Sequence, residues 1–126
     1  MNNEMNETNV IFSYTREQAL EDGVLVDVSE MAKEAGFRYP VALTSAVYRE
    51  FVEVPEGVDG QDEKGRLWDI LWMCGCAARK SQDSTMLFRF YVRNDKRLTT
   101  LVTLKAVCGP DDNGCPCITI MRTDED

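Results

Sequence analysis

The sequence predicts a single α+β domain, in which a C-terminal antiparallel three-stranded meander carries N-terminal short strands and helices packed on one face. Three observations lead to this class. The 126 residues are 44% hydrophobic, which suits one core of ordinary size. A helical apolar stripe marks residues 66–80, and the apolar repeat changes to the alternation of a strand after residue 85. We expect a flexible lead over residues 1–9, the domain over residues 10–121, and an acidic tail over residues 122–126 that frays.

The chain opens with a short strand and a short helix. Residues 10–14 are mostly apolar and of strand length. Thr15 is a favourable N-cap, and Gln18 stands three residues later, where it completes a capping box. The sequence therefore predicts a helix over residues 16–22 that ends at Gly23, since glycine commonly follows the last turn of a helix.

A second strand and two further short helices come next. Residues 24–28 are apolar enough for a buried strand, and Ser29 is expected to cap a helix over residues 30–35. A third helix is predicted to begin at the hydroxyl residues 44–45 and to run to about residue 52.

A loop over residues 53–65 separates these helices from the main one. Pro55 and three glycines interrupt regular structure there. The loop contains five acidic residues: Glu53, Glu56, Asp59, Asp62 and Glu63. Two interpretations stay open, a functional segment that presents negative charge and an insertion without a role of its own.

The main helix is predicted over residues 66–80, and two tryptophans lie beside its apolar stripe. Trp68 and Trp72 are four residues apart, and Asp69 follows the first of them. The ordinary interpretation is that the tryptophans pack structurally and that the acid suits the first turn of a helix. The alternative is an aromatic patch around a carboxylate at a binding surface.

Three strands are predicted to end the chain. Residues 86–92 and 98–106 alternate between apolar and polar side chains, and residues 117–121 form a shorter apolar run. Turn-forming residues separate these strands at 94–96 and 109–114. This order predicts an antiparallel meander with no helix inside it.

Several blocks of the chain are similar to those of one protein family. The blocks are Ser13–Arg16 with Gln18–Val28, Ala35–Thr44, Gly65–Met73, Leu101–Val107 and Gly109–Asp112. With them the chain resembles an uncharacterised family of small proteins encoded by phages, plasmids and other mobile elements of bacteria and archaea. The resemblance implies a mobile-element setting, and it implies no activity, cofactor or site residue.

Composition excludes several classes of site. The chain has no histidine, which rules out histidine-dependent triads and dyads, histidine-ligated zinc and histidine acid–base catalysis. No glycine-rich phosphate loop of standard spacing occurs. No apolar run has the length of a membrane helix, and the polar, acidic N-terminus lacks the features of a signal peptide. We therefore expect a cytoplasmic protein of a host bacterial cell.

The five cysteines are expected to be reduced thiols that hold no metal. Their odd number fits poorly with a closed set of disulfides. Cys74 and Cys76 diverge on a helix, whereas Cys115 and Cys117 share a face of a strand, with Cys108 across the turn. Three thiolates are one fewer than the four ligands of the usual structural zinc site. We therefore predict that the chain binds no metal and no cofactor, and a zinc site on these cysteines is the alternative.

The net charge of −8 is unevenly distributed. Residues 1–63 carry a balance of −10, whereas residues 64–126 carry +2. A negative half disfavours direct contact with nucleic acid, because phosphates attract lysine and arginine. Solubility and the attraction of a basic partner are the two interpretations that remain.

The first functional hypothesis is a small acidic non-catalytic binding protein of a mobile element. It inhibits or modulates a host nucleic-acid-handling or defence complex, of the CRISPR or restriction type, by protein–protein contact. The expected partner is a host protein with a basic surface, and neither direct nucleic-acid contact nor membrane contact is expected. The residues predicted to bind it are the five acids of the loop together with Trp68, Asp69 and Trp72.

Two alternatives stay open. One is a protein that binds or sequesters a small ligand, or a minor enzyme, through Asp, Arg and Tyr groups in a pocket. The other is a metal-stabilised accessory protein. The sequence identifies no partner and no oligomeric state.

Overall fold

The structure is a computed structural model that describes residues 14–95 and 98–126. The predicted lead, residues 10–13 of the first predicted strand and part of the predicted turn at 94–96 lie outside these residues. The described elements are α2 (Arg16–Asp22), β1 (Leu25–Asp27), α3 (Ser29–Glu34), β2 (Val41–Thr44), α4 (Ser45–Val47), the π-helical turn η1 (Tyr48–Val52), α5 (Glu63–Ala78), β3 (Thr85–Val92), β4 (Thr100–Pro110) and β5 (Pro116–Arg122).

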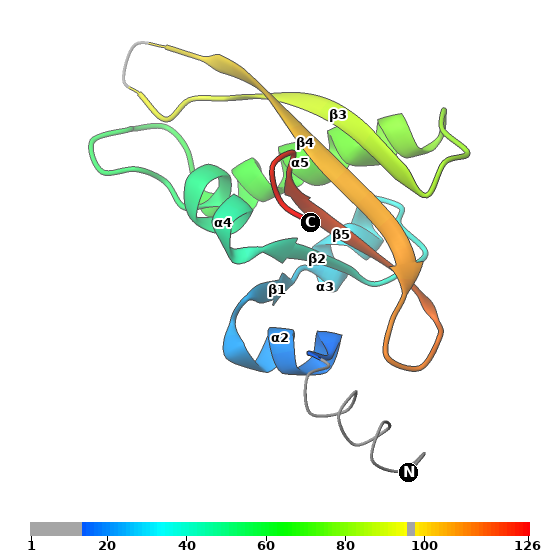
Figure 1. Ribbon diagram of the computed structural model, residues 1–126. Coiled ribbons are helices and arrows are strands. Elements are labelled where there is room, and N and C mark those ends of the chain that lie inside the picture. Colours follow the sequence, from blue (N-terminus) through cyan, green and yellow to red (C-terminus); the bar gives the residue numbers. More distant parts are fainter. Residues whose placement is uncertain (1–13, 96–97) are drawn as a thin grey trace, which may run out of the picture.

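The strands form one five-stranded sheet in the order β1-β2-β5-β4-β3 (Figure 1). Strands β3, β4 and β5 are antiparallel neighbours. Strand β5 also pairs in parallel with β2, through Val41 with Ile118 and Leu43 with Ile120, and β1 pairs antiparallel with β2. The chain is therefore a small α+β domain, as predicted, but its mixed sheet is larger than the predicted three-stranded meander.

Strand β1, predicted within residues 24–28, lies at one edge of the sheet, so the prediction that it packs on the face of the sheet is wrong. Strand β2 is a strand that the sequence pattern does not predict. In β2, Val41, Ala42 and Leu43 are at most 1% exposed. A strand buried on both faces needs hydrogen-bonding partners along both edges, and β1 and β5 provide them. The apolar alternation that predicts a strand indicates which of its faces is buried, but not which distant strand becomes its neighbour.

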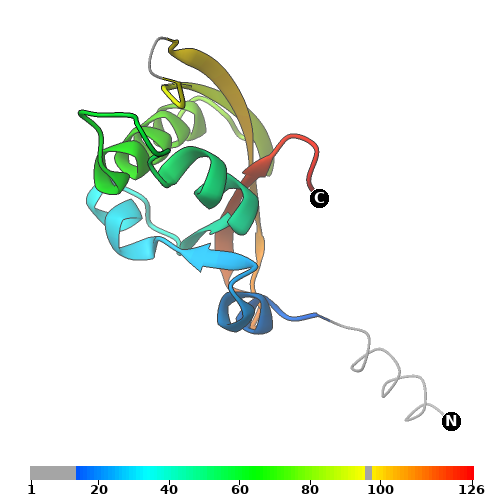
Figure 2. The ribbon, with the colours of Figure 1, turned by 90° about the vertical axis from the view of Figure 1, so that its left-hand side faces the viewer.

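Helices cover one face of this sheet. Figure 2 shows α3, α4 with η1, and α5 on the same side of the strands. The even-numbered residues of β3 and β4 point toward these helices, and Phe88 and Leu104 among them are buried in the core. The odd-numbered residues point to the opposite face, where Leu87, Tyr91 and Leu101 are exposed.

Helix α2 begins as predicted and is also held from the far end of the chain. The Thr15 hydroxyl accepts from the Gln18 N–H, and the Gln18 side chain accepts from the Thr15 N–H, which is the predicted capping box. The Asp112 carboxylate, between β4 and β5, accepts from the backbone N–H groups of Glu17 and Arg16 at 2.9 Å each. These bonds lower the pKa of Asp112 and tie α2 to the sheet.

Helix α3 begins one residue earlier than predicted. Ser29 is its first residue, and Val28 occupies the N-cap position without a side-chain capping bond. The Ser29 hydroxyl instead donates to Asp27 and accepts from the Val41 N–H at 3.0 Å, which links β1 to β2. The third predicted helix is present as α4 and η1, and Thr44 is its N-cap.

Helix α5 begins at Glu63, inside the predicted loop. Asp62 is its N-cap, because the Asp62 Oδ1 atom accepts from the Gly65 N–H at 2.8 Å. The loop therefore ends at Asp62. In the part of the chain that the structure describes, no helix is long and apolar enough to span a bilayer.

The acidic tail contacts the sheet, although it was predicted to fray. The Glu125 carboxylate accepts from the Thr44 hydroxyl and from the Arg122 N–H, both at 2.8 Å. The Lys105 ammonium donates to the Glu125 carbonyl. These bonds fix the end of the chain beside β2 and β4.

Candidate functional site

A groove runs between helix α5 and strand β3. One hollow, of about 720 Å³, lies at the N-terminal end of α5, and a second, of about 380 Å³, lies beside the middle of that helix. Both are lined by Trp68, Asp69, Phe90 and Tyr91, so they form one continuous feature. We call it the α5–β3 groove. The volume of each hollow is in the range of known binding pockets, and both hollows are open to solvent.

The helical repeat of α5 places its two tryptophans on the groove wall. Leu67, Ile70, Leu71 and Cys74 face the core, so the residues beside this stripe stay at the surface. Trp68 and Trp72 stack with ring centroids 5.9 Å apart and planes 19° apart, and Trp72 is 45% exposed. The Arg79 guanidinium lies 5.9 Å from the Trp72 ring. Trp68 packs against the hydrophobic core, as the ordinary interpretation expects, whereas the exposed surface of Trp72 is typical of a contact residue.

Asp69 supplies a carboxylate beside the tryptophans. Among the described residues, none donates a hydrogen bond to it or forms an ion pair with it. The residue as a whole is exposed, but its neighbours partly remove water from the carboxyl, and this burial raises the pKa of Asp69. A partly desolvated carboxylate without a partner favours the approach of a cationic group.

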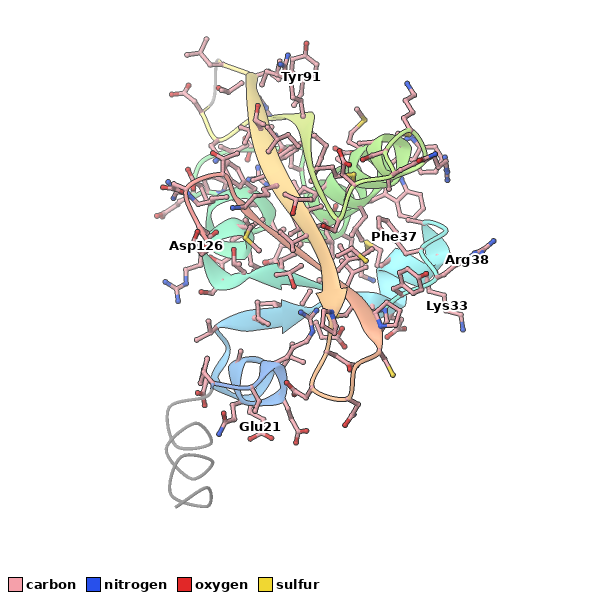
Figure 3. All side chains as sticks on the ribbon, turned by 45° about the vertical axis from the view of Figure 1, so that its right-hand side comes forward. Glu21, Lys33, Phe37, Arg38, Tyr91 and Asp126 are labelled. Atoms are coloured by element: carbon pink, nitrogen blue, oxygen red, sulfur yellow. The ribbon has the colours of Figure 1, made fainter. Side chains whose placement is uncertain are left out.

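Neighbouring residues of β3 form the floor and the rim of the groove. Phe90 is 2% exposed and packs edge-to-face against Phe51, with ring centroids 5.6 Å apart. Tyr91, the next residue, points to the opposite face of the sheet and is 68% exposed. Figure 3 shows Tyr91 at the end of the molecule where the β3–β4 hairpin turns.

Arg66 is buried at the N-terminal end of the groove and holds that end together. Its five N–H donors reach five acceptors, none of them a carboxylate: the carbonyls of Glu50, Phe51 and Arg93, and the side chains of Gln61 and Asn94. Burial lowers the pKa of Arg66. The sequence indicates none of this, because an arginine in the first turns of a helix is ordinarily exposed.

The structure divides the predicted acidic set into two groups. Asp62 caps α5 and lines the groove, and the Glu63 carboxylate accepts from the Tyr48 hydroxyl at 2.9 Å. Glu53, Glu56 and Asp59 are exposed on the loop and do not line the groove. Four of the eight predicted partner-binding residues therefore meet in the groove: Asp62, Trp68, Asp69 and Trp72.

The loop that carries these acids is anchored at its ends and in its middle. Val58 is 8% exposed, and the Arg93 guanidinium donates to the Asp59 carbonyl. The Gln61 amide donates to the Arg93 carbonyl at 3.4 Å. The loop backbone is therefore fixed beside the end of β3, and Glu53, Glu56 and Asp59 are exposed to solvent.

The cysteines do not gather into one site. Cys74 is fully buried and Cys117 nearly so, whereas Cys115 is exposed. Within residues 14–95 and 98–126, no group of three or more cysteine or acidic side chains is placed to hold a metal ion. The metal-free state stays a prediction, and one zinc per chain in an elemental analysis of the purified protein would contradict it.

We expect maleimide to modify Cys115 at least about a hundred times faster than Cys74 in the folded protein. Burial raises the pKa of Cys74 to about 12, so this thiol is both shielded and protonated at pH 8. Peptide mass spectrometry after timed labelling measures both rates. In urea the two cysteines should react at similar rates. Equal rates without urea would contradict the burial of Cys74 in the folded protein.

Comparisons with known proteins assign a family and no function. The sequence model of a family described as "Family of unknown function (DUF6573)" matches residues 1–126. No curated protein and no solved structure matches the chain. The mobile-element setting therefore rests on the resemblance of the sequence blocks.

Proposed function

We propose that this chain, which belongs to the DUF6573 family of unknown function, is a binding protein without catalytic activity that contacts a protein partner bearing a basic surface. The observation that carries the proposal is the α5–β3 groove. It combines the stacked pair of partly buried Trp68 and half-exposed Trp72 with the Asp69 carboxylate, which has no hydrogen-bond or ion-pair partner among the described residues. Aromatic faces and a desolvated carboxylate together favour a lysine or arginine side chain with its apolar stem.

The other polar groups that line the groove favour binding over chemistry. The Asp62 carboxylate caps α5, and all five donors of Arg66 are occupied by protein oxygens. Arg93 donates to the loop carbonyl of Asp59. These engaged groups also disfavour a small anionic ligand, since the arginines that would bind it already serve the fold.

The biological setting is part of the same proposal. The basic partner is a component of a host nucleic-acid-handling or defence complex, and the chain modulates that complex by occupying the basic surface. The mobile-element resemblance and the balance of −10 in residues 1–63 support this setting. Purification of the tagged protein from host cells, with identification of the co-purifying proteins, provides the partner for the measurements below.

The loop acids are expected to accelerate encounter with that partner. Replacing Glu53 and Glu56 with Gln and Asp59 with Asn should slow association about tenfold at low salt and leave dissociation nearly unchanged. Because the Debye length shrinks from about 10 Å at 0.1 M salt to about 3 Å at 1 M, the difference should vanish at high salt. Asp62 and Glu63 stay unchanged, since both make structural bonds.

Surface plasmon resonance at several salt concentrations measures these rates. A matched control removes three exposed acids elsewhere, through Glu21→Gln, Glu30→Gln and Glu34→Gln. Glu21 lies at the opposite end of the molecule from Tyr91 (Figure 3). If both triple variants slow association equally, overall charge and not the loop attracts the partner. If neither does, the acids serve solubility only.

A further inference from the structure

We propose that the partner is held as an extended segment that adds a sixth strand to the sheet, along the open edge of β3. This inference rests on the proposed binding function and specifies its mode and the chemistry of its ligand. The segment carries a lysine or arginine that enters the α5–β3 groove, and its backbone pairs with that of β3.

The register of the sheet shows which backbone groups of β3 face the open edge. Strand β3 is at one end of the sheet order, and its described partner is β4. The Ser84 carbonyl accepts from the Cys108 N–H at 2.7 Å, so the even-numbered residues turn their N–H and C=O groups toward β4. The odd-numbered residues Leu87, Arg89 and Tyr91 consequently turn theirs outward.

A second observation agrees with this assignment. The Arg93 carbonyl, next in the odd-numbered series, accepts from the side chains of Gln61 and Arg66. Both donors lie on the groove side of the strand. The fold thus provides donors for the outward-facing carbonyl just beyond the end of β3. Within β3 itself, no described residue forms a backbone hydrogen bond to the outward-facing groups of positions 87, 89 and 91.

The edge of β3 has few of the features that usually prevent unwanted strand pairing. The strand is eight residues long and contains no proline, and Arg89 is its one charged residue. Leu87 and Tyr91 on its outer face are 61% and 68% exposed. Natural proteins commonly interrupt such an edge with charged residues, proline or a bulge, so an eight-residue edge with the single charge of Arg89 favours a docking site.

The two sides of the edge specify the ligand. An added strand turns alternate side chains toward α5 and toward the outer face of the sheet. On the α5 side they meet the Trp68–Trp72 pair and the Asp69 carboxylate, which favour a lysine or arginine. On the outer face they lie beside Leu87 and Tyr91, which favour apolar residues. A basic residue alternating with apolar ones is therefore the expected pattern.

A second copy of the chain is a poorer occupant. Two β3 strands paired antiparallel about their middle place the two Arg89 side chains near each other, and like charges opposite one another destabilise a strand pair. In this pairing the Arg89 side chain of the second copy would not reach Asp69, because Arg89 points to the face of the sheet opposite the helices. Analytical ultracentrifugation tests this occupant: a dimer that Arg89→Pro dissociates would replace the proposed ligand.

The main experiment uses peptides of about twelve residues, selected on the full chain from a random display library, and then resynthesised. We expect the selected peptides to alternate basic and apolar residues. Arg89→Pro removes one outward-facing N–H that the β3–β4 ladder does not use, and should weaken peptide binding at least about tenfold. The matched control Arg89→Ala removes the side chain and keeps the N–H, so its affinity should stay within about twofold.

A second measurement holds even if Arg89→Pro does not fold. Amide hydrogen exchange of the wild-type chain should show new protection at Leu87, Arg89 and Tyr91 when the peptide binds, while Phe88 and Phe90 are protected already. N-methylation of alternate residues in the peptide should abolish binding when it removes the N–H groups that face β3. Methylation of the other alternate set, whose N–H groups point away from β3, should leave binding intact.

The outcomes separate the strand mode from the binding function. Suppose that the host partner binds. If Arg89→Pro does not weaken its binding, or if hydrogen exchange at the odd-numbered residues of β3 is unchanged, strand addition is wrong and the binding function stands. If no peptide is selected although the partner binds, strand addition is equally wrong. If the wild-type chain binds no protein from the host, the binding function fails as well.

Discussion

Replacing Arg66 with Met is expected to lower the free energy of unfolding by about 3 kcal/mol, measured by urea denaturation monitored by circular dichroism. Methionine keeps the apolar stem but removes all five donors. The carbonyls of Glu50, Phe51 and Arg93 and the side-chain oxygens of Gln61 and Asn94 then lose their partner at once. Water can reach some of these acceptors, so the loss is smaller than five times the cost of one buried unsatisfied group.

Arg66→Lys separates geometry from charge. Lysine keeps the charge but has three donors on one nitrogen, which cannot reach acceptors on η1, on the loop and on the β3–β4 turn together. We therefore expect most of the loss to persist in Arg66→Lys. A lysine variant as stable as the wild type would show that the charge, and not the set of hydrogen bonds, stabilises this region.

The sequence predicts local structure well where residues close together in the chain determine that structure. The start of α2 is one example, because Thr15 and Gln18 are three residues apart and complete each other's hydrogen bonds. The alternation in β3 is another, because burial of every second side chain repeats along the strand itself. Both features need only the neighbouring residues.

Long-range structure is where prediction from the sequence ends. The parallel pairing of Val41 with Ile118 joins strands with most of the chain between them, and no local pattern specifies it. Asp112 caps α2 across a sequence separation of 95 and 96 residues. Neither contact leaves a signal in the spacing of residues, because both depend on how the finished sheet brings the two ends of the chain together.

The candidate site shows the same division. Trp68, Asp69 and Trp72 can be proposed from the sequence because helical spacing places them on neighbouring parts of one helix. Tyr91 and the open edge of β3 cannot be proposed from the sequence, because they become part of a groove only when α5 packs beside β3, the edge strand of the sheet. The alternation of β3 does predict that Tyr91 is exposed, but not that a groove lies next to it.

Two neighbouring residues of β3 are expected to separate stability from binding. Phe90→Ala should lower the free energy of unfolding by about 4 kcal/mol, because it empties a buried site and removes the edge-to-face contact with Phe51. Tyr91→Ala should change it by less than about 0.5 kcal/mol, because Tyr91 is largely in solvent. Urea denaturation of both variants measures the difference.

Binding is expected to show the reverse order for Tyr91. Tyr91→Ala should weaken a selected peptide by about tenfold, because exposed aromatic residues at an interface core often dominate affinity. If circular dichroism shows that the Phe90→Ala chain is folded without denaturant, its affinity for the peptide should fall less than that of Tyr91→Ala, because Phe90 is 2% exposed and offers the ligand little surface. The exposed Leu101, which the register pairs with Tyr91, gives a matched control through Leu101→Ala. If Leu101→Ala and Tyr91→Ala weaken the peptide equally, the ligand lies across the face of the sheet and not along its edge.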